Sequence, residues 1–137
     1  CLFDDDVFVT KKSAGDNNYI MSGDTLMVAS TGSVLAIGKT AYVKDDYTNV
    51  HIGAFLRILR PLYKNFAEYI GFFFQSQRYK LQIQELAKGS NINNIKASYI
   101  TNMQIGLPPL NEQKRIVATI KELYSVLDEI EASLQSL

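Results

Sequence analysis

Residues 32–40 bring together residue types that can bind a phosphate: glycines, a lysine and a threonine. A nucleotide-binding P-loop has the form G-x-x-x-x-G-K-[ST], a length that lets successive backbone N–H groups surround a phosphate. Here five residues separate Gly32 from Gly38, one more than the motif allows, and residues 34–37 are apolar strand material. The spacing argues against a nucleotide-hydrolysing enzyme and predicts a tight turn or a bulge at Gly38. It leaves Lys39 on an exposed loop, available for a phosphate contact or for water alone.

Two further groups of residues fail the tests for catalytic or metal chemistry. Leu107-Pro108-Pro109-Leu110 contains the proline pair of amino-methyltransferase motifs, but not the polar residue before it or the aromatic residue after it. His51 is the only histidine, and without a cysteine or second histidine nearby in the sequence it suggests neither a metal cluster nor a catalytic triad. We therefore expect no catalytic residue and no metal site, and we interpret His51 as a packed or surface histidine.

The centre of the chain is basic. Residues 57–96 contain seven lysines and arginines against two acidic residues, a net charge of +5, although the whole chain is neutral. Such a stretch is typical of a nucleic-acid-binding face, and the ordinary solvated faces of helices and strands are the alternative. Basic side chains would contact phosphates, whereas amides, hydroxyls and arginine on loops would read base edges in the major groove. The candidate DNA-binding residues, selected by side-chain chemistry at loops and element ends, are Ser30, Thr31, Ser33, Lys39, Arg57, Arg60, Lys88, Asn91, Asn93, Asn94 and Lys96.

Turn residues and apolar runs divide residues 1–107 into short elements. The expected strands are 7–9, 25–29, 34–37, 40–43, 52–59 and 103–107. A helix is expected from Asn65 to about residue 88, because Glu68 follows Asn65 at the spacing of a capping box, and a short helix is expected at 97–100. The pattern predicts an α+β fold that is mostly antiparallel and β-rich, with packed helices.

Residues 108–137 give the longest uninterrupted helical pattern in the chain. Pro108 and Pro109 end the preceding segment, Asn111 is the expected N-cap, and no glycine or proline follows. Apolar residues recur at spacings of four and three, a heptad seam of the coiled-coil type that favours pairing with another helix. A helix lying on its own domain is the alternative. The predicted pairing residues are Ile116, Ile120, Leu123, Leu127, Ile130, Leu134 and Leu137.

Composition limits the class of protein. Hydrophobic residues make up 47% of the chain, which is typical of a folded protein. No run reaches the roughly 18 apolar residues that a membrane span needs. Cys1 is the only cysteine, which excludes an internal disulfide and favours a cytoplasmic setting without a membrane partner. We expect one domain, 1–107, followed by the helix, 108–137.

Several short motifs follow one another in a characteristic order. They are Ser22-Gly23-Asp24-Thr25-Leu26, Ser30-Thr31-Gly32-Ser33, Ile37-Gly38-Lys39, Phe72-Phe73-Phe74-Gln75-Ser76, Gly89-Ser90, and Leu107-Pro108-Pro109-Leu110-Asn111-Glu112-Gln113 with Ile116. The last motif, which enters the long helix, is the specific one. In this order and spacing the chain resembles, over essentially its whole length, one target-recognition half of a type I restriction–modification specificity subunit.

The resemblance implies a non-catalytic subunit with two target-recognition domains, each reading one half of a split site in double-stranded DNA and each followed by a long helix. The helix would pack as a spacer against that of a second copy or of the second half of the same subunit. The subunit would dock methyltransferase subunits, which hold S-adenosylmethionine, and through them ATP-driven restriction subunits, so this chain would need no cofactor. Such domains usually extend further toward the N-terminus, so the resemblance also implies that the domain over 1–107 is N-terminally incomplete.

A second class of function is compatible with the residues alone. The long helix would dimerise a scaffold whose body binds a protein or peptide without DNA specificity. Steep salt dependence of duplex binding would separate the two classes, because counterion release from DNA has no counterpart in a peptide groove.

Overall fold

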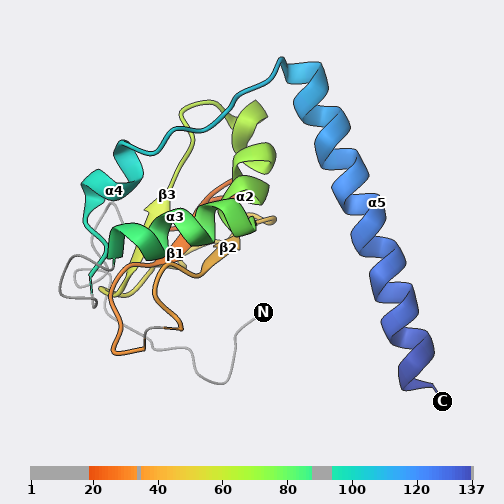
Figure 1. Ribbon diagram of the computed structural model, residues 1–137, viewed down its shortest axis with the longest axis horizontal. Helices are drawn as coiled ribbons and strands as arrows, with labels where there is room; N and C mark the ends of the chain where they lie inside the picture. Colours follow the sequence, from red (N-terminus) through yellow and green to blue (C-terminus); the bar gives the residue numbers. More distant parts are fainter. Residues whose placement is uncertain (1–18, 34, 88–93, 137) are drawn as a thin grey trace.

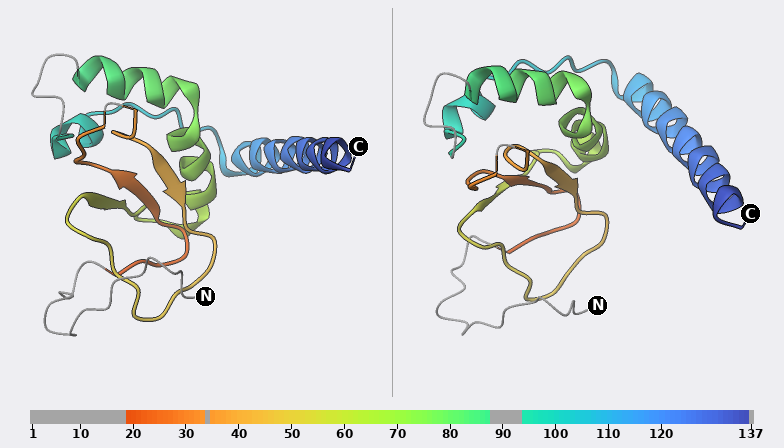
Figure 2. Two further views of the ribbon diagram at one scale, coloured as in Figure 1. Left: turned by 90° about the horizontal axis from the view of Figure 1, so that it is seen from below. Right: turned by 60° about the horizontal axis from the view of Figure 1, so that its bottom comes forward.

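The computed structural model describes residues 19–33, 35–87 and 94–136, which form a small sheet, helices packed on it and a projecting terminal helix (Figure 1). In chain order the elements are β1 (Thr25–Val28), β2 (Thr40–Tyr42), β3 (Leu56–Leu59), the 3₁₀ helix η1 (Lys64–Phe66), α2 (Ala67–Gln75), α3 (Gln77–Ala87), α4 (Ala97–Thr101) and α5 (Leu110–Gln135). α2 and α3 lie over one face of the sheet, whereas α5 extends away from this body (Figure 2). None of the helices in the described ranges is long and apolar enough to traverse a lipid bilayer.

The sheet places β1 between β2 and β3, and both pairs are antiparallel. Leu26 lies opposite Ala41 on β2 and Ile58 on β3, which fixes the register on both sides. β1 alternates buried and half-buried residues, because successive side chains of a strand point to opposite faces. The fold is α+β as predicted. Its expected β-rich character is not confirmed, since the described residues form one sheet of three short strands.

The strand expected at 34–37 is wrong, because this part of the chain makes turns. The N–H groups of Ala36 and Ile37 both donate to the carbonyl of Ser33 at 3.1 Å. Gly38 follows with φ +74°, a left-handed conformation that glycine adopts without a Cβ penalty, and the predicted turn at Gly38 is thereby confirmed. Ile37 is buried, so the apolar run inserts a side chain into the core instead of pairing with a neighbouring strand.

The other strand predictions differ in outcome. Those at 25–29 and 40–43 are confirmed as β1 and β2, and the one at 52–59 shortens to β3. Residues 103–107 form no strand, and their alternating apolar pattern reflects the packing of Met103 and Ile105 against the core. The strand expected at 7–9 lies outside the described residues.

The helix expected over 65–88 is divided into η1, α2 and α3. Its expected cap, Asn65, lies inside η1, and neither η1 nor α2 has a side-chain cap. The division falls at Ser76, whose ψ of 154° is extended and whose Oγ accepts a hydrogen bond from the N–H of Tyr79 at 3.3 Å. Ser76 therefore caps α3. The short helix expected at 97–100 is confirmed as α4.

The core lies between β1 and the two helices above it. Its buried members are Met27, Ala29, Ile37, Phe74, Tyr79, Ile83 and Ile95. Tyr79 donates its hydroxyl hydrogen to the carbonyl of Gly38 at 3.0 Å, and burial raises the pKa of Tyr79 to about 12. The turn before β2 is therefore attached directly to the core, which holds the following residue, Lys39, in a defined place.

Gly71 allows α2 to pack closely against Tyr42 of β2. A Cβ at this position would lie 2.5 Å from ring atom Cδ2 of Tyr42. We expect Gly71→Ala to lower the free energy of unfolding by about 1 kcal/mol, because overpacking costs roughly 1–3 kcal/mol and the higher helix propensity of alanine offsets about 1 kcal/mol. Urea denaturation measures the change. Gly106→Ala is the control, since no heavy atom lies within 4 Å of its added Cβ; a Gly71→Ala protein more stable than wild type would contradict the close packing.

Candidate nucleic-acid interface

Three chain segments converge where β1 ends. The N–H groups of Ala29 and Ser30 both donate to the carbonyl of Phe55, at 2.9 and 3.1 Å. The N–H of Ile95 donates to the carbonyl of Ala29 at 2.7 Å, and Ser30 forms an isolated β-bridge with Asn94. Residues distant in sequence are thus joined by backbone hydrogen bonds at one end of the sheet. We call this place, residues 29–33, 39, 55–57 and 94–96, the loop end of the sheet.

The loop after β1 is held in place by its own hydrogen bonds. The Oγ1 of Thr31 accepts from the N–H of Ser33 at 3.2 Å, a local turn that Ser and Thr side chains favour. The N–H of Val28 donates to the carbonyl of Lys39 at 2.9 Å, and Gly38 returns a bond to Val28. Exposed Lys39 therefore lies beside the end of β1, although eleven positions separate it from Val28 in the sequence.

Most of the predicted DNA-binding residues that the structure describes gather at the loop end. Arg57 lies opposite Met27 on β3 and is exposed, and Asn94 and Lys96 are exposed on the incoming segment. The gathered residues are Ser30, Thr31, Ser33, Lys39, Arg57, Asn94 and Lys96. Lys88, Asn91 and Asn93 lie outside the described residues. The fold thus brings residues with hydroxyl, amide and basic side chains to one end of the sheet, a combination suited to phosphates and base edges.

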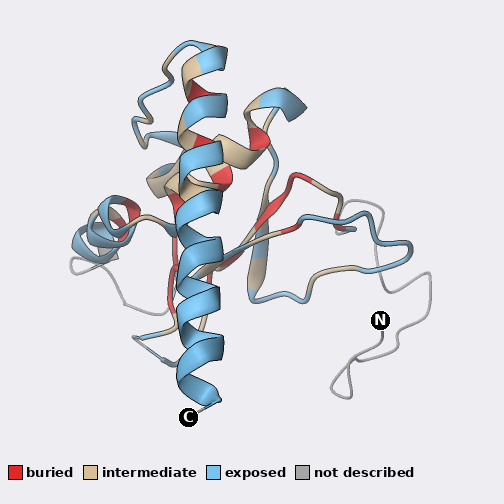
Figure 3. Ribbon diagram, turned by 90° about the vertical axis from the view of Figure 1, so that its right-hand side faces the viewer, coloured by how far each residue is buried: buried red, intermediate tan, exposed pale blue. Residues whose placement is uncertain are grey.

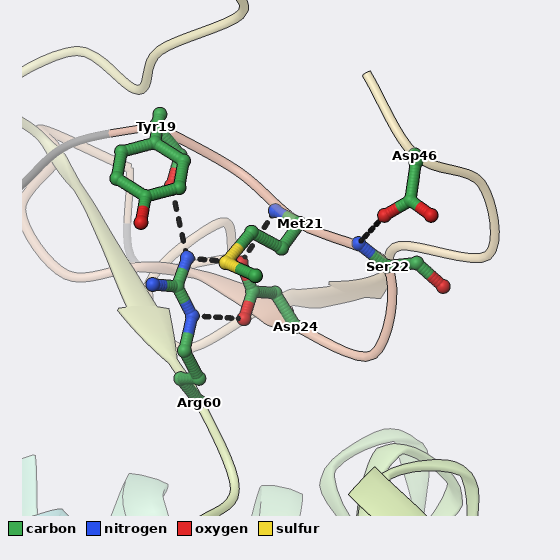
Figure 4. Close-up of polar contacts among 6 residues, drawn as sticks. All are labelled: Tyr19, Met21, Ser22, Asp24, Asp46 and Arg60. Atoms are coloured by element: carbon green, nitrogen blue, oxygen red, sulfur yellow. Dashed lines mark hydrogen bonds and ion pairs between the residues drawn. The ribbon is translucent and has the colours of Figure 1, made fainter. Parts of the chain in front are cut away.

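Arg60 is separated from this group, because β3 carries it to the opposite end of the sheet. Its Nε and Nη2 donate to Oδ1 and Oδ2 of Asp24, each at 2.8 Å, in a bidentate pair (Figure 4). Nη2 also donates to the carbonyl of Tyr19 at 3.0 Å, and the guanidinium lies 5.2 Å from the centre of the Tyr19 ring. The hydrogen bond to Asp24 raises the pKa of Arg60. Arg60 therefore connects β3 to the start of β1.

Asp24 is a buried polar residue that the sequence showed only as part of a short motif. Its side chain is 1% exposed, against 38% for that of Arg60. Its Oδ2 also accepts from the N–H of Met21 at 2.8 Å, while nearby Ser22 donates its N–H to Asp46 (Figure 4). A single sequence holds no signal for the Asp24–Arg60 pair, because the two residues are 36 positions apart.

The first turns of α5 attach it to the body. The Nε2 of Gln113 donates to the carbonyl of Pro108 at 2.7 Å, and Gln113 and Val117 are buried. Lys121 forms an ion pair with Glu68 of α2. α5 begins at Leu110 after Pro109, so the expected N-cap at Asn111 is wrong, and the N–H groups of residues 112 and 113 instead donate to the carbonyl of Pro109.

An aromatic contact completes this attachment. The rings of Phe72 on α2 and Tyr124 on α5 are stacked, with their centres 6.3 Å apart. From Lys121 to Ser136 every described residue is exposed, and Figure 3 shows the lower half of the helix as an uninterrupted pale-blue ribbon. The alternative of a helix that lies along its own domain therefore holds only for the first half of α5, as far as Tyr124.

The predicted helix-pairing residues form a stripe that the body leaves mostly uncovered. Ile116 and Ile120 are half-buried near the attachment, and Leu137 lies outside the described residues. The exposed fractions are 59% for Leu123, 57% for Leu127, 51% for Ile130 and 66% for Leu134. Since residues of an α-helix are rotated by about 100° each, this stripe lies about 100° around the helix from the face that contacts the body. The body and a partner helix would therefore use different faces of α5.

Comparison with known proteins assigns the chain to a family. The family model of the type I restriction modification DNA specificity domain matches residues 8–136. The chain is 33% identical over 131 residues to the type I restriction enzyme EcoKI specificity subunit of Escherichia coli (strain K12) and to the StySPI specificity subunit of Salmonella potsdam. These matches cover 96% of this chain and 28% of each relative, so the chain spans little more than a quarter of their length. No solved structure gives a significant match. The chain belongs to the family of type I restriction–modification DNA specificity domains.

Proposed function

We propose that this chain is a non-catalytic target-recognition unit in which residues 1–107 read one half of a split double-stranded DNA site and residues 108–137 form the spacer helix. The observation that carries the proposal is the gathering of polar and basic loop residues at one end of the sheet. The exposed apolar stripe of α5 supports the second role. The names of its two relatives, both specificity subunits of restriction enzymes, agree with it.

The side chains at the loop end divide by chemistry into two roles. Lys39, Arg57 and Lys96 would contact phosphates and set the register of the domain on the duplex. The hydroxyl and amide residues, namely Ser30, Thr31, Ser33 and Asn94, would read base edges, with asparagine suited to adenine. Lys88, Asn91 and Asn93 stay candidates by sequence. Arg60 would reach DNA only through the part of its guanidinium that Asp24 and Tyr19 leave open.

The second part of the proposal concerns how α5 would assemble the complex. α5 would pair along its stripe with the equivalent helix of a second copy or of a second half of the parent chain, and the pair would set the gap between half-sites. Methyltransferase subunits carrying S-adenosylmethionine would dock on this unit, and ATP-driven restriction subunits would bind through them. The chain itself would hold no cofactor.

Selection of duplex DNA tests the reading role. The full-length parent protein, with its methyltransferase partner, is mixed with a random duplex library at several salt concentrations. We expect enrichment of a split motif with a fixed gap. Asn94→Ala should relax the base preference at one position of one half-motif, since a good base contact contributes roughly 1–3 kcal/mol of discrimination. Asn111→Ala, an exposed asparagine at the start of α5, is the control and should leave the motif intact.

A helix-dimerising scaffold without DNA specificity is the second candidate, because the exposed stripe of α5 is compatible with either function. Binding without enrichment, or binding that salt does not weaken, would favour the scaffold. Enrichment of a motif together with a steep salt dependence would exclude it.

A further inference from the structure

A hollow of about 210 Å³ lies beside the loop end, between the turn before β2 and the corner where α2 meets α3. Buried Ile37, Phe74 and Tyr79 form its apolar floor. The exposed side chains around it include Lys39 from the start of β2 and Lys80 from α3. The fold thus brings two lysines from distant parts of the sequence to one small concave surface.

Hydrogen bonds connect the elements that line this hollow. The hydroxyl of Thr40 donates to the carbonyl of Phe74 at 2.7 Å, which joins β2 to the end of α2. The hydroxyl of Ser76 donates to the carbonyl of Phe73 at 2.6 Å, and the hydroxyl of Tyr79 donates to the carbonyl of Gly38. These groups fix the spacing of the two elements that carry the lysines, so the cations do not depend on a flexible loop for their positions.

The charge of the hollow is one-sided. Lys39 and Lys80 line it, and no acidic residue of the described chain does so. A second hollow, under α5, is lined by Lys44 and Lys121 together with Glu68 and Asp128, and is therefore electrically balanced. Lys80 also lies in the first turn of α3, where the positive end of the helix dipole adds to its charge. Of these two hollows, only the first is suited to an anion.

We propose that Lys39 and Lys80 together hold one backbone phosphate of duplex DNA, so that α3 flanks the bases read at the loop end. The inference rests on the proposed DNA-reading function and adds Lys80 and a shared phosphate to it. The position supports a backbone phosphate, because the backbone of Lys39 is hydrogen-bonded to Val28 at the end of β1, next to the bridge between Ser30 and Asn94. Both lysines are exposed, and the buried hydroxyl of Tyr79 that lines the hollow already donates to Gly38, an arrangement that suits a polyanion releasing counterions better than a small free anion.

Salt-dependent binding of duplex DNA tests the shared phosphate in the full-length parent protein. The variants are Lys39→Gln, Lys80→Gln and the double substitution, and the quantity is the slope of log K against log salt concentration. One lost phosphate contact reduces the slope by about 0.9, which corresponds to roughly eightfold weaker binding at 0.1 M salt. We expect the slope of the double variant to fall by about 0.9 and that of each single variant to fall by no more than this. The reduction in slope should be equal for all DNA sequences.

Lys114→Gln, an exposed lysine on α5, is the matched control and should keep the wild-type slope. A slope that is unchanged in the double variant, or that falls by about 1.8, overturns the shared phosphate. Loss for one DNA sequence alone shows that these lysines read a base and also overturns it. Millimolar binding of inorganic phosphate that disappears in the double variant identifies a free-anion site instead. If the wild-type parent protein shows no salt-dependent binding of duplex DNA, the proposed DNA-reading function itself is refuted. This outcome is distinct from the outcomes above, which refute only the shared phosphate.

Discussion

Replacing Arg60 by methionine is expected to lower the free energy of unfolding by about 3 kcal/mol. The change leaves the carboxylate of Asp24, which is 1% exposed, without its bidentate partner in the protein interior. Removing one member of a buried ion pair costs roughly 3–5 kcal/mol, and the low end applies because the Arg60 side of the pair is open to water. Urea denaturation followed by circular dichroism measures the loss.

Arg57→Met is the control for this prediction, because Arg57 is an exposed arginine on the same strand, β3. Its effect on unfolding should stay within about 0.5 kcal/mol. The double variant Asp24→Leu with Arg60→Met should recover part of the loss, since it removes the isolated charge. Equal destabilisation by Arg57→Met and Arg60→Met would show that the Asp24 pair contributes nothing specific.

Placing aspartate at Leu127 and Leu134 together is expected to abolish self-association of this chain through α5. Each leucine buried at a helix interface contributes roughly 1.5–3 kcal/mol, so a pair of helices that loses four of them would bind at least about ten-thousandfold more weakly. The body should stay folded, because both side chains are exposed and lie beyond the attachment to α2. Light scattering at micromolar concentration reports the mass.

Leu127 and Leu134 are better targets than Ile120, which is half-buried next to the body. The control, Ala118→Asp with Ala132→Asp, adds the same charge to exposed positions on the opposite side of the helix. It should keep the mass of the wild-type chain. If both double variants have the same mass as wild type, the apolar stripe is not a pairing surface.

Local patterns predicted the elements whose shape depends on neighbouring residues. The spacing of apolar residues predicted the long helix, and its exposed stripe was visible in the positions of Leu123 to Leu134. The turn at Gly38 followed from its place between two apolar runs. The break at Ser76 also has a signal in the sequence, because serine is a preferred N-cap residue. Its Oγ accepts a hydrogen bond from the N–H of Tyr79, three positions later, where α3 begins.

Features that depend on tertiary packing could not be predicted in this way. The apolar run ending at Ile37 has the composition of a strand, but Tyr79 and Ile83 hold it in a turn against the core. The loop end was predicted as a set of residue types, whereas the bridge from Ser30 to Asn94 that assembles it joins positions far apart. The Asp24–Arg60 pair is likewise long-range, and it gives Arg60 a structural partner that its charge alone did not indicate.

The attachment of α5 along its first half makes the second half a lever. The 11 residues after Tyr124 extend about 17 Å at 1.5 Å per residue. A rotation of roughly 10° about Tyr124 moves the far end by about 3 Å, which is close to the 3.4 Å rise of one base pair. In the proposed assembly, the angle held by the Phe72–Tyr124 stack and the Lys121–Glu68 pair would therefore determine which gap between half-sites is accepted. The stiffness of this small contact, more than its contribution to stability, would set the accuracy with which the distance along DNA is measured.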